Sequence, residues 1–195
     1  MIINSKSTAK ILGVLFYQWQ SKAETQSLIS ALTLEHVLTS ECKSALISEP
    51  EESLSHEFQR LFNGIGPMPA PPWGSVYLDK DRVIFGHSTV DYRQFLHSQD
   101  MDMDTGTREP EDQFGLMLMA YSYLLEVNKV KAAIELLEKH LLPWAPDYLQ
   151  LLSNSTDIKY FKALAVETKQ WLAVLVEENQ LQVEQKKLYL DARIH

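Results

Sequence analysis

Apolar residues recur at helical spacing along most of this chain, and no stretch alternates strongly enough to predict a β-strand. The clearest pattern belongs to the last long helix, which we expect to begin near Asp157. One stripe of that helix carries Ile158, Phe161, Leu164, Ala165, Thr168, Trp171, Leu172 and Leu175. Near the N-terminus, apolar positions 11, 12, 15, 16 and 19 also share one helix face. The pattern predicts an all-α fold of about ten helices in two closely packed halves.

Capping signals and the same spacing place the other helices. Ser48-x-x-Glu51 predicts a capping box that opens a helix with a proline in its first turn. Further helices are expected at residues 25–39, 41–47, 88 or 89 to 97, 109–127 and 129–141. Pro143 and Pro146 predict a turn. Residues 180–195 are expected to fray or to form a short terminal helix.

The segment Leu61 to Asp79 interrupts this helical pattern with four prolines and three glycines. Proline fixes φ and lacks a backbone donor, so the cluster Pro67 to Pro72 predicts a stiff, polyproline-type loop. Such a loop would present Trp73 rigidly. The simpler interpretation is a connector whose tryptophan covers a helix end.

A second unusual segment, Glu109-Pro110-Glu111-Asp112-Gln113, precedes the apolar run that begins at Phe114. Proline suits the first position of a helix, and the positive end of the helix dipole stabilises nearby carboxylates. The segment therefore predicts a helix start. The polar residues 98–108 before it predict a hinge, at about 99–108, between an N-terminal half (1–98) and a C-terminal half (109–195). Such a hinge would allow a domain-swapped dimer beside the monomer.

Composition narrows the classes of function. The chain has 195 residues, of which 45% are hydrophobic and 23% charged, as expected for a folded domain. Its net charge of -8 disfavours nucleic acid as a partner and suits a cationic one. The single cysteine, Cys42, cannot form an internal disulfide, which favours the cytoplasm. Residues 6–17 superficially resemble a secretory signal, but two glutamines interrupt the apolar run, and we expect neither a leader nor a membrane span.

Motifs of common enzyme classes are absent from the sequence: it has no phosphate-binding glycine loop, zinc-protease motif, nucleophile elbow or cysteine pair. We therefore expect no catalytic residue, no metal and no cofactor. One alternative is an all-α metal-dependent or nucleotide-hydrolysing enzyme that uses His87, Asp91, Glu109 and Asp112 as ligands. Another is a helical scaffold adaptor in which the proline loop serves only stability.

Five blocks, in one order along the chain, resemble a known family. They are Leu61-Phe62 with Gly64, the block Pro71 to Asp79, Phe85-Gly86-x-Ser88-Thr89, Glu109-Pro110-x-Asp112, and His140-Leu141-x-Pro143-Trp144. Together they resemble the TorD/DmsD/NarJ family of maturation chaperones for twin-arginine-exported molybdoenzymes, and most closely its DmsD branch. The chain departs from the family at Gln113, where a histidine usually follows the aspartate. It also lacks an aromatic residue that some relatives carry where Ile65-Gly66 stands here.

The resemblance implies a cytoplasmic, non-catalytic chaperone that binds the twin-arginine leader of a molybdopterin-containing oxidoreductase. The client would be of the dimethyl sulfoxide or trimethylamine oxide reductase type, and the chaperone would hold back its export until the cofactor is inserted. The export translocase is a further expected partner. The candidate leader-binding residues are Leu61, Phe62, Pro72, Trp73, Tyr77, Gly86, Glu109, Pro110, Asp112 and Gln113. Apolar residues of the loop would contact the leader's hydrophobic part, while Glu109 and Asp112 would meet its arginines.

Overall fold

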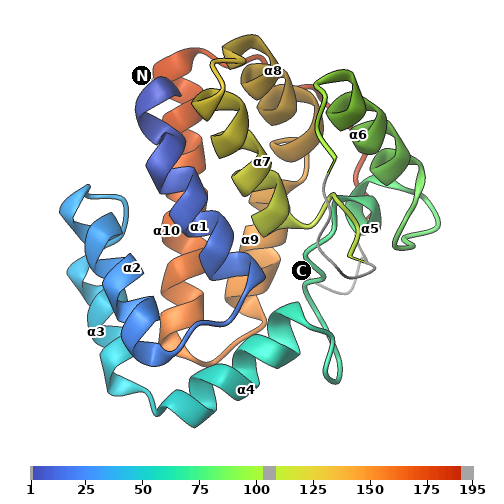
Figure 1. The fold of residues 1–195 in the computed structure, drawn as a ribbon. Helices are drawn as coiled ribbons and strands as arrows, with labels where there is room; N and C mark the ends of the chain where they lie inside the picture. Colours follow the sequence, from blue (N-terminus) through green and yellow to red (C-terminus); the bar gives the residue numbers. More distant parts are fainter. Residues whose placement is uncertain (1, 103–108, 190–195) are drawn as a thin grey trace.

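The computed structural model describes residues 2–102 and 109–189, and its regular elements are helices (Figure 1). After a 3₁₀ turn, η1 (Ile2–Ser5), come α1 (Lys6–Tyr17), α2 (Lys22–Leu34), α3 (Ser40–Ser48), α4 (Glu51–Phe62), α5 (Gly74–Leu78) and α6 (His87–Ser98). The later elements are α7 (Phe114–Glu126), α8 (Val130–Glu135), the π-helix η2 (Leu136–Leu141), α9 (Ala145–Asn154) and α10 (Lys159–Asn179). The all-α prediction is confirmed.

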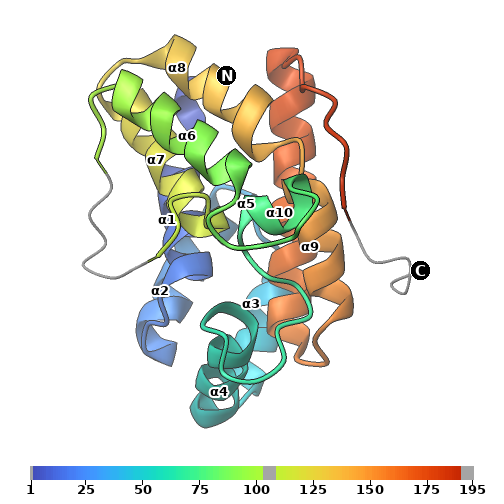
Figure 2. The same cartoon turned by 90° about the vertical axis from the view of Figure 1, so that its right-hand side faces the viewer.

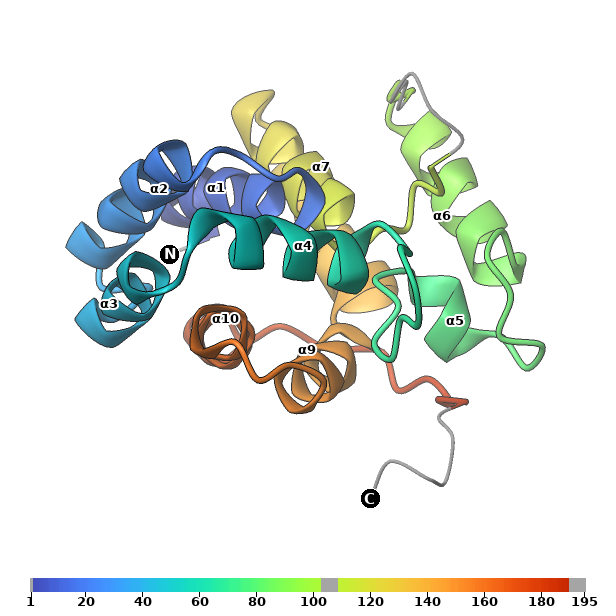
Figure 3. The same ribbon diagram turned by 90° about the horizontal axis from the view of Figure 1, so that it is seen from below.

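The helices form two layers. Seen from below, α1, α2 and α7 lie on one side and α9 and α10 on the other, while α4 crosses the lower end (Figure 3). The short α5 and α6 stand together beyond α7 (Figures 2 and 3). This arrangement leaves α7 in the centre, and its sequence is apolar on nearly every side for that reason.

The crossing of α1 over α7 depends on two glycines. A Cβ atom at Gly13 would lie 2.7 Å from the carbonyl oxygen of Gly115. A Cβ atom at Gly115 would lie 2.5 Å from the carbonyl oxygen of Gly13 and 2.9 Å from the Cβ atom of Tyr17. Any larger side chain would push the two backbones apart, so these glycines set the helix separation.

Two predicted helix starts were wrong. Ser48 is the last residue of α3, and its hydroxyl donates to the carbonyl oxygen of Ala45 instead of capping the next helix. The helix expected at residue 109 begins at Phe114, because the Gln113 side chain accepts a hydrogen bond from the backbone N–H of Leu116 and so caps it. Pro110 therefore lies in a turn before α7.

Other predicted boundaries shift for similar local reasons. α2 begins at Lys22, three residues early, because Ser21 and Glu24 form a capping box. The predicted 61–79 loop contains α5, and α9 follows the predicted turn because proline is tolerated in its first turn. The described part of the C-terminal segment, up to residue 189, is extended rather than helical. Residues 103–108 of the predicted hinge and 190–195 lie outside the described residues.

The stripe predicted for the last helix is confirmed in its main members. Tyr160, Phe161, Leu164, Ala165, Thr168, Leu172 and Leu175 are buried on α10. Ile158 precedes this helix, and Trp171 is only partly buried against the core. Among the described residues, none of the helices is long and apolar enough to cross a membrane.

Candidate functional site

The two unusual segments of the sequence meet in the structure. The backbone N–H of Phe114 donates to the carbonyl oxygen of Pro72 (2.8 Å), and that of Gly74 donates to the carbonyl oxygen of Asp112 (3.1 Å). These bonds form an antiparallel bridge between Trp73 and Gln113. We call residues 72–75 and 109–113 the signature junction. It brings five of the candidate residues together: Pro72, Trp73, Glu109, Asp112 and Gln113.

Asp112 lies at the centre of the junction and is only 3% exposed. Its Oδ2 accepts hydrogen bonds from the backbone N–H of Ser75 (2.7 Å) and from Oγ1 of Thr89 (3.0 Å). Its Oδ1 is buried and has no hydrogen-bond partner among the described residues. Burial raises the pKa of this carboxyl, although the hydrogen bonds from Ser75 and Thr89 oppose the shift. The structure thus contains a buried carboxylate with one unused oxygen.

Trp73 lies at the edge of the junction and is half-buried. Its indole Nε1 donates to Oε1 of Glu109 at 2.7 Å, which fixes the orientation of the ring. The pKa of Glu109 is raised, mainly by burial and also by the negative charge of Asp112, while the bond from Trp73 lowers it. An aromatic surface and a carboxylate are therefore presented side by side.

Gln113 joins the junction to the helix crossing. Its side-chain Nε2 donates to the carbonyl oxygen of Phe16 at 2.9 Å, and its Oε1 accepts from the N–H of Leu116 at 2.9 Å. The residue is 2% exposed. Both hydrogen-bonding ends of the amide are used inside the protein, so Gln113 positions the ends of α1 and α7.

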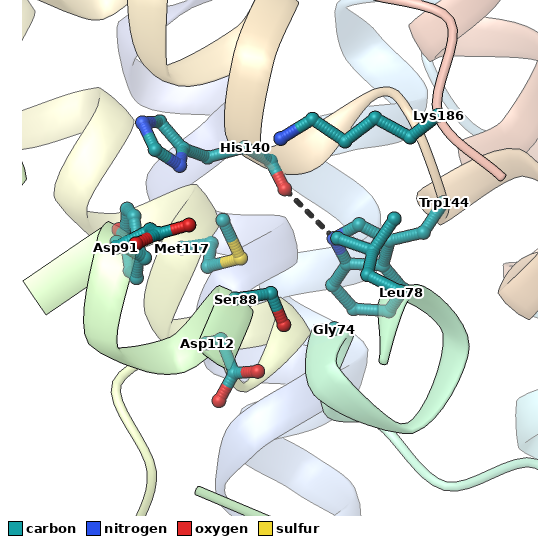
Figure 4. A pocket seen from close by; sticks show the side chains of 10 residues that line it. Gly74, Leu78, Ser88, Asp91, Asp112, Met117, His140, Trp144 and Lys186 are labelled. Atoms are coloured by element: carbon teal, nitrogen blue, oxygen red, sulfur yellow. Dashed lines mark hydrogen bonds between the residues drawn. The ribbon is translucent and has the colours of Figure 1, made fainter. Parts of the chain in front are cut away.

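A small cavity lies behind the junction (Figure 4). It has a volume of about 20 Å³, enough for about one water molecule. Residues lining it include Gly74, Tyr92, Asp112, His140, Trp144 and Lys186. The Trp144 indole donates to the carbonyl oxygen of His140 at 2.9 Å. Burial lowers the pKa of His140 to about 4, assisted by the positive charge of Lys186, so the ring is neutral at physiological pH.

The comparisons with known proteins follow the geometry. A family model described as the nitrate reductase delta subunit matches residues 22–150. The chain is 34% identical over 182 residues to the Tat proofreading chaperone DmsD of Salmonella typhi, covering 87% of this chain and 89% of that protein.

The chain belongs to this family. The chaperone protein TorD of Psychrobacter is 29% identical over 53% of this chain and 52% of its own length. A crystal structure of a redox enzyme maturation protein from Archaeoglobus fulgidus shares the fold, with a TM-score of 0.59 and 14% identity. That match covers 88% of this chain and 93% of the other. The family predicted from the sequence is confirmed, and its member here is a maturation chaperone rather than an enzyme.

The other candidate residues of this DmsD/TorD-family chain lie deeper. Leu61, Phe62 and Tyr77 are 1%, 4% and 1% exposed and belong to the core. Pro72 and Pro110 are buried as well. As the structure stands, a ligand at the surface would therefore reach Trp73 and Glu109 first.

Gly86 supports the site indirectly. A Cβ atom at this position would lie only 1.9 Å from Oδ2 of Asp79. That carboxylate accepts hydrogen bonds from the backbone N–H and the hydroxyl of Ser88, in the first turn of α6. A side chain at Gly86 would displace Asp79, so the glycine preserves this helix start and the placement of Thr89 beside Asp112.

The alternative metal site finds no support in the geometry. Within residues 2–102 and 109–189, no group of three or more His, Cys, Asp or Glu side chains is arranged to hold a metal ion. His87 and Asp91 are exposed on α6, whereas Asp112 is buried and bonded to Ser75 and Thr89.

Sequence reasoning missed several residues of the site. Tyr92 is fully buried, and its hydroxyl has no hydrogen-bond partner among the described residues. It belongs to an ordinary helical stripe, so no local signal distinguished it. Lys186 lies in a segment without periodicity, and only its tertiary position reveals it. Val83, Ile84 and Phe85 form a consecutive apolar run that remains about half exposed, between α5 and α6.

Proposed function

We propose that this chaperone binds the twin-arginine leader of a molybdopterin-containing oxidoreductase precursor in the cytoplasm and holds back export until the cofactor is inserted. Dimethyl sulfoxide and trimethylamine oxide reductases are the client types. The proposal is supported by the similarity to a protein named as a Tat proofreading chaperone along most of the chain. The export translocase is proposed as a second partner.

The observation that carries the proposal is the signature junction. Trp73 offers a rigid aromatic surface, Glu109 a carboxylate beside it, and Asp112 a buried carboxylate oxygen without a partner. A guanidinium group forms paired, charge-assisted bonds with carboxylates and stacks on aromatic rings. The junction therefore has the chemistry to select arginine, and the net charge of -8 attracts a basic leader.

The leader's apolar stretch needs a separate surface, because Leu61 and Phe62 are buried. The exposed run Val83, Ile84 and Phe85 offers one, at 49%, 46% and 48% exposure. We place the apolar part of the leader on this run, which joins α5 to α6.

The location in the cytoplasm agrees with the state of Cys42. Its side chain is fully buried, and burial raises the pKa of the thiol to about 12. The thiol is therefore unreactive in the folded protein.

Calorimetric titration with twin-arginine leader peptides tests the proposal. Trp73→Ala should weaken binding by about 1–3 kcal/mol, because it removes both an aromatic contact and the group that orients Glu109. Trp171→Ala, on α10 and partly buried, is the matched control and should leave leader affinity unchanged. Equal binding by wild type and Trp73→Ala would count against the junction as the leader site.

The same titration separates the apolar contact from the charged one. Ile84→Ser should weaken leader binding, whereas Val174→Ser, which is similarly exposed on α10 at 49%, should not. A leader whose two arginines are replaced by glutamine should lose affinity for wild type. If no leader from a panel of molybdoenzyme precursors binds, the proposed function is wrong.

A further inference from the structure

The C-terminal segment of the chain lies against the candidate site. α10 ends at Asn179, Gln180 adopts a left-handed conformation (φ 53°), and residues 181–189 then run in an extended conformation (Figures 2 and 3). We call residues 181–189 the C-terminal strap. It is built into the structure at its first residue, since Leu181 is only 7% exposed.

Backbone hydrogen bonds attach the strap along its length. The N–H of Gln182 donates to Oε1 of Glu138 (2.5 Å), and the N–H of Glu184 donates to the carbonyl oxygen of Glu138 (2.9 Å). Further on, the N–H of Tyr189 donates to the carbonyl oxygen of Tyr77 at 2.8 Å. The strap therefore passes from η2 to α5, the helix that follows Trp73.

Backbone bonds of this kind do not depend on side chains. A different peptide in an extended conformation could form them equally well.

Lys186 of the strap lines the cavity behind the signature junction. Figure 4 shows its side chain directed into the site toward His140, with Asp112 across the cavity. Only 29% of the side chain is exposed, and its ammonium lies 3.7 Å from a carboxylate oxygen of Glu184. The same cavity is lined by Asp112 and Tyr92, whose Oδ1 and hydroxyl have no partner among the described residues. A cation thus lies beside acceptors that remain unpaired.

The strap has the order of chemistry expected of a leader. Lys186 and Lys187 form an adjacent basic pair, and the apolar Leu188 and the aromatic Tyr189 follow directly. Leu188 packs against the core, and Tyr189 bonds to the backbone of Tyr77. A twin-arginine leader likewise carries adjacent basic residues followed by an apolar stretch.

We propose that the C-terminal strap is an internal ligand, which occupies the leader's path over η2 and α5 and is displaced when a leader binds. This inference rests on the proposed function. The ammonium of Lys186 is a compact point charge, whereas a guanidinium presents several donors in a planar fork and can satisfy more of the acceptors around the cavity. A leader arginine therefore outcompetes Lys186. Since the strap is tethered at a high effective concentration, it lowers the apparent affinity for weakly matching peptides.

Amide hydrogen exchange on the full chain tests displacement directly. Without leader, the N–H groups of Glu184 and Tyr189 should be protected by their bonds to η2 and α5. Saturation with a twin-arginine leader peptide should accelerate their exchange at least tenfold, while amides within α10 stay unchanged. Unchanged protection of both amides in a chain shown to bind the leader would overturn the inference.

Substitution of the basic pair provides the second test. The double variant Lys186→Ala/Lys187→Ala should bind the leader about threefold to tenfold more tightly, because its strap competes less well. The control Lys162→Ala/Lys169→Ala removes the same charge from α10 and accounts for the general attraction between an acidic protein and a basic leader. An affinity gain no greater than in the control, or a loss, would also overturn the inference.

The two proposals fail in different ways. Failure of the inference alone would give normal leader binding with a protected strap. Absence of leader binding in wild type and in both double variants would instead contradict the proposed function itself.

Discussion

The helix crossing and the signature junction meet at the start of α7, but their packing differs. At the crossing, Gly13 and Gly115 bring two backbones into direct contact, and no polar side chain takes part. At the junction, Asp112 and Ser75 keep buried oxygen atoms without a partner among the described residues. An unpaired buried polar atom costs stability, so the junction is arranged for something other than packing. The comparison teaches that stability and recognition are separated over a few residues of one helix start.

The largest effect should come from breaking the crossing. Gly115→Ala places a Cβ atom 2.5 Å from the carbonyl oxygen of Gly13, and the backbones cannot move apart without opening the core. We expect a loss of about 3 kcal/mol or more in the free energy of unfolding, measured by urea denaturation. Gly66→Ala is the control: its site is open, and only its positive φ of 94° opposes the substitution, at a cost of about 1 kcal/mol. Similar losses for the two variants would show that the crossing tolerates a side chain.

His140 should make the cavity region sensitive to acid. Its pKa in the folded protein is about 4, below the value near 6.5 in the unfolded chain, so the unfolded chain takes up the proton first. The stability contributed by the neutral ring is complete above about pH 6.5 and is lost as the pH falls toward 4. We expect this loss to reach about 2 kcal/mol, since the ring keeps some contact with solvent.

The His140→Phe variant isolates this contribution, because it preserves a ring beside Tyr92 and Phe95 and cannot titrate. Denaturation of wild type and variant at several pH values between 4 and 7 provides the measurement. Parallel pH profiles would exclude His140 as the source of acid sensitivity.

Gln113 lies between the two regions, and its loss should cost less. Gln113→Ala leaves the carbonyl oxygen of Phe16 and the N–H of Leu116 buried without this partner, for an expected loss of about 1–2 kcal/mol. In Gln113→His, the neutral imidazole can form the same two bonds, so stability near pH 7 should be closer to that of wild type. If the histidine variant is as unstable as the alanine variant, the pair of hydrogen bonds is not what the residue contributes.

Asp112→Asn should have the smallest effect on stability and a clear effect on binding. The amide oxygen can accept the bonds from Ser75 and Thr89, and the substitution removes a buried charge. Because the carboxyl pKa is raised, the folded state favours the protonated form, and wild-type stability gains as the pH falls through that pKa. At pH 7 we expect a change within about 1 kcal/mol in unfolding, together with weaker leader binding. Full leader affinity in a stable Asp112→Asn protein would mean that this carboxylate serves the fold alone.

Several parts of the fold could be predicted from the sequence because their causes are local. The stripe of α10 follows from 3.6-residue periodicity, and the family follows from blocks of residues in a fixed order. The start of α7 could not be predicted, because Pro110 and the acidic residues imitate a helix start while Gln113 provides the actual cap. The Asp112 carboxylate bonds instead to the first turn of α5, 37 residues away in sequence.

The site was predictable in its edge and not in its depth. Trp73 and Glu109 stood out through unusual neighbours, and the structure joins them by a hydrogen bond. Tyr92 and Lys186 could not be found, because an ordinary helix stripe and a segment without periodicity bring them to the cavity. The assignment of the leader to these residues stays a prediction, as do the division into halves at residues 99–108 and the domain-swapped dimer.

The π-helix η2 fixes the length of the chain in its neighbourhood. A π turn accommodates more residues than an α turn, so deletion of one residue between Leu136 and Leu141 would allow the segment to wind as an ordinary α-helix. Everything after it would then be rotated by about 100° relative to α8. Trp144 would turn away from Gly74, and Glu138 would no longer face the backbone of Glu184. In this part of the molecule, sequence variants can exchange side chains freely only while the number of residues is conserved.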